Sequence, residues 1–245
     1  FCCGTYNSGD INVQIYRGVS GSYISQVSAG GVIATNRWQH VALTFNSSTK
    51  TYAIYVNGIS VTLSTGGSGT APASFSYSTS NHTYVAAFGR AQAAAPGNYF
   101  PGNICNLRIT KSIVYSATFT PPDLLNYPIS AITNTRLLLK TNYPDGSTIT
   151  DSSNYATPLT INGVVTSSSS FPPSNPPLLY SVYFDGTGYL SFPASTTWQM
   201  TGDFTIECWY YHTTNDVALF DQYTAGTTAV GNWQFWITGN TFYFY

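Results

Sequence analysis

The chain has 245 residues, of which only 7% are charged and 16% are aromatic, and its formal net charge is −1. This length is sufficient for a full hydrophobic core, and the aromatic content argues against a disordered chain. A net charge near zero gives no electrostatic reason to bind nucleic acid or anionic lipid, so no nucleic-acid partner is expected. No apolar run reaches the roughly 20 residues that a membrane helix needs, and no membrane span is expected.

The first strong strand pattern covers residues 38–45, in which every second residue from Gln39 to Phe45 falls on one face. A polar turn at residues 46–50 follows. Residues 52–56 form the expected return strand, which stops at Asn57-Gly58, a dipeptide typical of tight hairpin turns.

Further strands are predicted along the rest of the chain. They lie at residues 59–63, 83–88, 102–109, 135–139, 181–184, 188–192, 204–211, 232–237 and 241–245. Short strands separated by turn signals at this spacing predict an all-β fold, an antiparallel β-sandwich of the jelly-roll kind. Its expected core positions are Val41, Leu43, Phe45, Ile54, Val56, Leu107, Ile109, Val182 and Ile206.

Residues 142–178 differ in composition from the rest of the chain. Four serines at residues 167–170 precede two pairs of prolines at 172–173 and 176–177. This composition predicts a connector between structural units, without regular structure over residues 167–177. Within it, residues 158–165 are compatible with a short edge hairpin.

Several segments resemble the laminin-G-like, concanavalin A-like jelly rolls found as repeats in phage (cyanophage-type) tail-fibre and other virion structural proteins. Residues 36–58 resemble that family's "W-x-H-V-A … L-Y-V-N-G" hairpin, and residues 102–109 its "G-x-I-S-N-L-R-I" strand. Residues 114–122 are similar to its "Y-x-x-x-F-T-P-P" segment. Residues 181–190 and 202–209 resemble its two opening strands. The resemblance implies the sandwich fold and a location on a virion surface or outside the cell.

The order of these segments is inverted relative to the family. Residues 1–141 resemble the later two-thirds of one domain, and residues 179–245 resemble the opening strands of a second repeat. Residues 12–16 also match residues 232–236, 220 positions later. We therefore expect a tandem array in a longer chain or filament, with head-to-tail contacts to neighbouring repeats or copies. The alternative is a single permuted sandwich, in which residues 179–245 open the same domain.

Catalysis is not expected. Glycosidases that share this sandwich need two carboxylates beside the sugar, and Glu207 is the only glutamate in the chain. A structural role for Glu207, accepting hydrogen bonds within the sheet, is therefore expected. The histidines His40, His82 and His212 have no metal-ligand spacing and no partner nucleophile.

Two kinds of binding site remain as hypotheses. No cofactor is expected, but the resemblance makes calcium at the rim of the sandwich the alternative, with Asp10 and Asp185 as candidate ligands. A carbohydrate-binding role would place aromatic rings of loop residues against cell-surface glycans. The candidates for this stacking are Tyr6, Tyr99, Phe100 and Tyr223.

Two functions are thus predicted for the chain. The first is a non-catalytic structural module of a virion appendage or extracellular fibre. The second is a lectin-like receptor-recognition domain.

Overall fold

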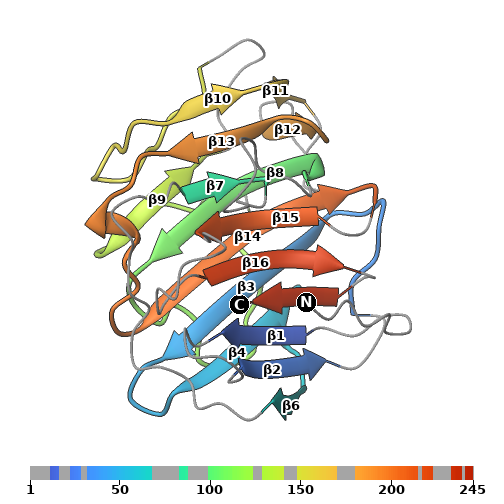
Figure 1. Ribbon diagram of the computed structural model, residues 1–245, viewed down its shortest axis with the longest axis vertical. Coiled ribbons are helices and arrows are strands. Elements are labelled where there is room, and N and C mark those ends of the chain that lie inside the picture. The colour runs from blue at the N-terminus through green and yellow to red at the C-terminus, as the bar shows by residue number, and fades with distance from the viewer. Residues whose placement is uncertain are drawn as a thin grey trace.

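The computed structural model is a two-layered β-sandwich (Figure 1). The residues that it describes are 12–16, 23–28, 32–67, 83–87, 99–123, 129–140, 148–169, 180–214, 217–222, 233–238 and 241–244. Within these ranges every recorded strand pairing is antiparallel, which confirms the predicted fold class. None of the described residues forms a helix that is long and apolar enough to cross a membrane.

The front layer in Figure 1 contains two sheets that lie edge to edge. The larger has the order β10 (Thr160–Asn162), β13 (Tyr189–Phe192), β7 (Thr83–Val85), β15 (Val217–Gln222), β16 (Trp233–Thr238), β17 (Thr241–Phe244). The smaller has the order β1 (Asn12–Tyr16), β2 (Tyr23–Ser28), β6 (Leu63–Gly67).

The back layer is a single sheet. Its order is β11 (Val165–Ser168), β12 (Ser181–Asp185), β8 (Pro101–Thr110), β14 (Phe204–His212), β3 (Gln39–Asn46), β4 (Thr51–Val56), β5 (Ile59–Ser60). The remaining strand, β9 (Thr135–Leu139), pairs with the second half of β8. A 3-10 turn, η1 (Thr196–Trp198), follows β13.

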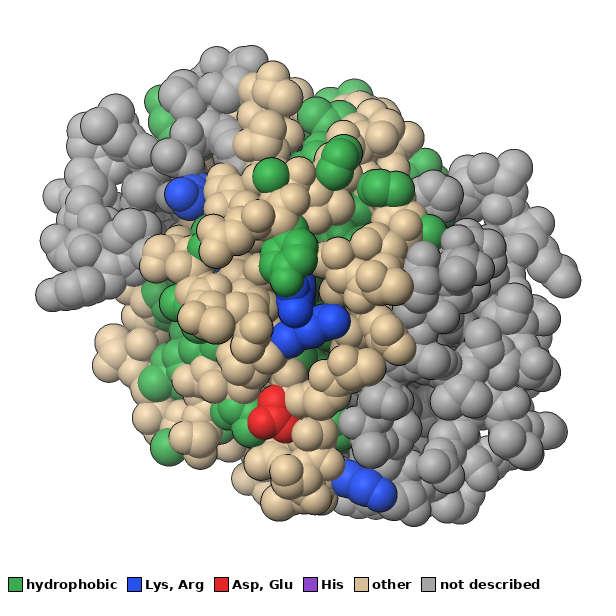
Figure 2. Space-filling model, turned by 90° about the vertical axis from the view of Figure 1, so that its left-hand side faces the viewer, with side chains coloured by type: hydrophobic (Ala, Val, Ile, Leu, Met, Phe, Trp, Pro, Cys, Tyr) green, Lys and Arg blue, Asp and Glu red, His purple; other side chains and the backbone are tan. Residues whose placement is uncertain are grey.

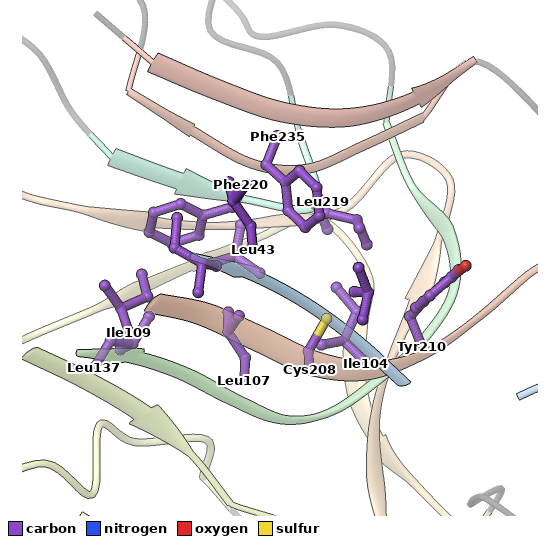
Figure 3. Close-up of a cluster of buried hydrophobic side chains, with 14 of the residues drawn as sticks. Leu43, Ile104, Leu107, Ile109, Leu137, Cys208, Tyr210, Leu219, Phe220 and Phe235 are labelled. Carbon is purple, nitrogen blue, oxygen red and sulfur yellow. The ribbon is translucent and has the colours of Figure 1, made fainter. Parts of the chain in front are cut away.

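The hydrophobic core lies between the two layers. Figure 3 shows Leu43 of β3 and Ile109 of β8 from the back layer near Phe220 and Phe235 of the front layer. The nine positions predicted for the core are all buried, with exposed fractions of 0–7%: Val41, Leu43, Phe45, Ile54, Val56, Leu107, Ile109, Val182 and Ile206. The alternation of apolar residues along the strands therefore located the core face correctly.

β14, which contains one of the two segments that resemble the opening strands of laminin-G-like domains, lies between β3 and β8 of the same chain. Ile206 is opposite Leu43 on one side and opposite Ile109 on the other. All three side chains are buried, so β14 fills a place in the core that residues 1–141 alone would leave open. The permuted alternative expects this intrachain pairing, whereas the assignment of residues 179–245 to a second repeat stays a prediction.

Part of the predicted connector belongs to the sandwich. Residues 148–169 include β10 and β11, which extend the front and back layers respectively. The expected hairpin at residues 158–165 is not formed, because its two strands lie in different sheets. Ser167 and Ser168 pair with Val182 and Ser181, so the expectation of irregular structure is wrong for these two serines. Residues 170–177 lie outside the described residues.

Two cysteines are buried, in accordance with their strand-like sequence context. Cys105 on β8 and Cys208 on β14 are both unpaired and about 1% exposed. Burial raises the pKa of both thiols, which favours the protonated, unreactive form.

Candidate functional site

Glu207 lies in the middle of β14 and points away from the core. Its neighbours Ile206 and Cys208 face the core, and successive side chains of a strand alternate between faces. Across the sheet, Glu207 is opposite Ala42 of β3 and Arg108 of β8. It is nevertheless fully buried, so another segment must cover this face of the back layer.

The carboxylate of Glu207 is surrounded by three polar side chains. The Nε of Arg108 donates to Oε1 over 2.8 Å, and Nη2 of Arg108 also contacts Oε1. The hydroxyl of Tyr115 donates to Oε2 over 2.7 Å, and Nε2 of His40 lies 3.3 Å from the same oxygen. Arg108 is held in turn by the carbonyl oxygen of Ser130, which accepts from Nη1 over 2.9 Å. The predicted role of Glu207 as an acceptor of hydrogen bonds in the sheet is seen here.

These contacts favour the ionised form of Glu207. Burial by itself would raise the pKa of Glu207, but the contact with His40, the charge of Arg108 and the Tyr115 hydroxyl lower it below its usual value. The same site raises the pKa of Tyr115 through burial and the nearby carboxylate. A glycosidase's general acid needs the opposite, a carboxyl group with a raised pKa that can give up a proton to the leaving group.

Residues 111–123, here called the cover segment, close the outer face of the back layer. The Oγ1 of Thr205 donates to the carbonyl oxygen of Ser112 over 2.8 Å and accepts from the amide of Val114 over 2.9 Å. The rings of Tyr115 and Phe119 stack with centroids 3.6 Å apart. The cover segment therefore seals the Glu207 cluster from solvent.

The β4–β5 turn fixes the far end of the cover segment. The amide of Phe119 donates to the carbonyl oxygen of Gly58, and a Cβ at Gly58 would lie 1.9 Å from the carbonyl oxygen of Phe119. The backbone of Gly58 is also left-handed, with φ of +77°. Both features require glycine at this position.

We expect Gly58→Ala to destabilise the protein by about 1–3 kcal/mol from backbone strain, and further because the cover segment must move. Gly202→Ala is the matched control, since Gly202 has φ of +89° but no atom within 4 Å of an added Cβ. Urea unfolding should give a larger loss for Gly58→Ala than for Gly202→Ala. Equal losses would show that the close approach of the cover segment is not important.

Three of the described aspartates, Asp151, Asp185 and Asp203, organise turns. Asp185 accepts from the amides of Thr187 and Gly188 and from the hydroxyl of Thr187, and the Thr187 amide bond is the main cause of its lowered pKa. Asp151 likewise accepts four hydrogen bonds, three from backbone amides and one from the hydroxyl of Ser153. Asp203 accepts from the amide and the hydroxyl of Ser47.

Calcium binding at Asp185 stays a prediction, because its described contacts are hydrogen bonds within its own turn. Its oxygens face amide and hydroxyl donors of its own turn, whereas calcium needs six to eight oxygen ligands. Within the described ranges, no group of three or more His, Cys, Asp or Glu side chains could hold a metal ion. The other predicted ligand, Asp10, lies outside the described residues.

The structure describes two of the four aromatic residues that were predicted to stack on a ligand. Tyr6 and Tyr223 lie outside the described residues. Phe100 is fully buried, with its ring edge-on to Phe184 at 6.2 Å, so a stacking role on a ligand is incompatible with its position. Tyr99 is half-buried and lies at the surface of the front layer beside Tyr189.

Tyr99 belongs to a group that sequence reasoning missed. The centroid of the Tyr189 ring lies 6.0 Å from that of Tyr99 and 5.8 Å from that of Tyr84. Tyr84 and Tyr189 point away from the core, because Val85 and Leu190 beside them are buried in it. We call Tyr84, Tyr99 and Tyr189 the tyrosine group. The alternation along β7 and β13 was the signal that could have identified it.

His212, at the end of β14, is buried, and neither ring nitrogen has a hydrogen-bond partner in the described part of the chain. Burial lowers the pKa of His212 to about 4. In the unfolded chain the imidazole takes up a proton near pH 6.5, whereas the folded protein resists protonation until about pH 4. Stability should therefore fall as the pH drops from 6.5 towards 4.

We expect His212 to account for about 2–3 kcal/mol of lost stability between pH 7.5 and pH 4.5. His212→Gln removes the ionisable group, so its free energy of unfolding should change less over the same interval. Chemical denaturation of both proteins at the two pH values measures the difference. An identical pH dependence in the two proteins would rule out this role of His212.

Three comparisons with known proteins show what the chain is similar to. The searches of curated proteins and of solved structures gave no match. Residues 3–117 match the laminin-G family model described as the concanavalin A-like lectin/glucanases superfamily. This match and the two antiparallel layers both fit a β-sandwich of the jelly-roll kind.

Proposed function

We propose that the chain is a non-catalytic structural module of a virion appendage or another extracellular fibre. The observation that carries the proposal is the state of Glu207. The only glutamate of the chain is buried and bound by Arg108 and Tyr115, so it serves the stability of the sheet. A structural module needs no group that exchanges protons with a substrate.

The surface is in keeping with this role. In Figure 2, charged side chains are sparse on the described part of the visible face, and uncharged polar groups and scattered hydrophobic residues occupy most of it. A composition with 7% charged residues requires such a surface. Uncharged polar surfaces allow neighbouring modules to pack without burying unpaired charges, which are costly to desolvate. We place the protein on a virion surface or outside the cell, with neighbouring repeats or copies as partners.

Two measurements test this proposal: hydrolysis of polysaccharides by the chain and its binding to glycans. The purified chain is incubated with a panel of polysaccharides while the release of reducing ends is measured, and it is then applied to a glycan array. The proposal expects no release of reducing ends and no binding to a defined sugar. Turnover that is lost in Glu207→Gln would overturn the proposal in favour of a glycosidase.

A second function, recognition of cell-surface glycans, is favoured by the tyrosine group. Three half-buried tyrosine rings lie together on the front layer, and Asn162 and Ser191 provide polar groups beside Tyr189. Aromatic faces with adjacent amides and hydroxyls can hold a sugar by stacking and hydrogen bonds. Sub-millimolar binding on the array that Tyr189→Ala abolishes would support this function. Tyr183→Ala, on the back layer, is the matched control for an exposed tyrosine.

A further inference from the structure

Two positively charged side chains, Lys111 and Arg136, lie close together where β8 ends and β9 begins. Thr110, the last residue of β8, is opposite Thr135, the first residue of β9. The amide of Lys111 then donates to the carbonyl oxygen of Asn134 over 3.0 Å. Arg136 is therefore the diagonal neighbour of Lys111 across the two strands, within reach of long side chains. In Figure 2, Lys and Arg side chains adjoin near the middle of the visible face.

Neither positive charge has a partner in the part of the chain that the structure describes. The ion pairs found there both involve Glu207, whose partners are Arg108 and His40. No described acceptor receives a hydrogen bond from the side chain of Lys111 or of Arg136, and the Nε of Arg136 is buried. Burial, and after it the charge of Arg136, lowers the pKa of Lys111. The two cations therefore repel each other without a counter-charge between them.

The carboxylate of Asp151, which lies beside β9, does not neutralise these cations. It accepts from the amide of Leu138 on β9 over 3.0 Å. It also accepts from the amides of Ser153 and Thr157 and from the hydroxyl of Ser153, all within its own segment. Among the described Lys and Arg side chains, none forms an ion pair with Asp151. A counter-charge for the two cations would thus have to come from a ligand.

Tyr155 holds the guanidinium of Arg136 in place. The Cζ of Arg136 lies 4.3 Å from the centroid of the Tyr155 ring, which is a cation–π contact. The hydroxyl of Ser153 links the two residues, because it donates to the carbonyl oxygen of Arg136 over 3.3 Å and accepts from the amide of Tyr155 over 3.2 Å. Tyr155 is 48% exposed, and Lys111 and Arg136 are both partly exposed, so a ligand in solvent can reach them.

We propose that Lys111 and Arg136 bind one oxyanion, the carboxylate, sulfate or phosphate group of a ligand. A guanidinium donates two parallel hydrogen bonds to two oxygens of such a group, and an ammonium group adds a further charge-assisted bond. Binding replaces the repulsion between the two cations with attraction to a shared anion. The site is independent of the fibre role and of the tyrosine group, since neither of them involves a charge.

Isothermal titration calorimetry in a chloride buffer of fixed pH and ionic strength tests the site. The probes are inorganic phosphate, inorganic sulfate and an oligosaccharide of glucuronic acid. The chain should bind at least one of them. The double variant Lys111→Gln with Arg136→Gln should bind that probe about tenfold or more weakly, because it loses charge-assisted hydrogen bonds. Lys50→Gln is the matched control, since Lys50 is exposed in the β3–β4 turn, and it should bind as the wild type does.

The same titrations identify the source of the anion. Tighter binding of the oligosaccharide than of either inorganic ion would assign the site to an acidic saccharide, and tighter binding of an inorganic ion would assign it to a free anion. Absence of binding for all three probes would overturn the proposal. So would equal affinities in the double variant and the wild type.

Urea unfolding in the chloride buffer separates binding from a structural role. Lys111→Gln alone removes the repulsion and leaves the contact between Arg136 and Tyr155 intact. This variant should be at least as stable as the wild type and should bind the probe more weakly, so it also serves if the double variant does not fold. A Lys111→Gln protein that loses stability but keeps its affinity would contradict the site.

Discussion

Replacing Glu207 with leucine should destabilise the protein by about 3–5 kcal/mol, the usual cost of removing one partner of a buried ion pair. The side chain of Arg108 is only 7% exposed, so the substitution leaves its positive charge buried without a counter-charge. The Tyr115 hydroxyl would lose its acceptor as well. Since a domain of this kind is stable by roughly 5–15 kcal/mol, much of the stability would be lost.

The double variant Glu207→Leu with Arg108→Met is the control for this prediction. With both charges gone, the site becomes apolar, and the double variant should be more stable than Glu207→Leu alone. Urea unfolding of the wild type, both single variants and the double variant gives the coupling energy of the pair. A loss below about 1 kcal/mol in Glu207→Leu, the range of a solvent-exposed pair, would contradict the buried ion pair.

Leu43→Ala should cost about 2–5 kcal/mol, because it removes buried methyl groups and leaves a cavity between the layers. Leu43 is fully buried at the centre of β3, opposite Ile206 and near Phe220 in Figure 3. The matched control is Ile59→Ala, since Ile59 is 64% exposed on the short edge strand β5. Its loss should be within about 0.5 kcal/mol. Chemical denaturation that gives similar values for the two variants would contradict the register of β3.

Strand alternation was sufficient to predict the core. The period of two along residues 39–45 places Leu43 inward, and the Asn57-Gly58 turn is formed with φ of +50° and +77°. A run of serines carries no such signal. Ser167 and Ser168 form part of β11 because an edge strand can be held by backbone hydrogen bonds to β12 without an apolar face of its own.

The candidate site depended on contacts that are distant in the sequence. The single glutamate predicted a structural role for Glu207, but Arg108 and Tyr115 lie more than 90 positions away and only the sheet order brings them together. Phe100 shows that the sequence also failed to predict the burial of a residue proposed for ligand binding. It follows Tyr99 directly, and the sequence does not indicate which of the two rings points outward. The amide of Phe100 donates to the carbonyl oxygen of Ala86, and its ring lies in the core.

The fibre role is tested most directly by immunoelectron microscopy of native material from the source of the protein. An antibody against the chain is applied to intact particles and cell surfaces, and the positions of the label are recorded. Our account predicts label along a thin appendage, at regular intervals set by the repeating sandwich. Label confined to discrete globular particles, with no appendage marked, would contradict it.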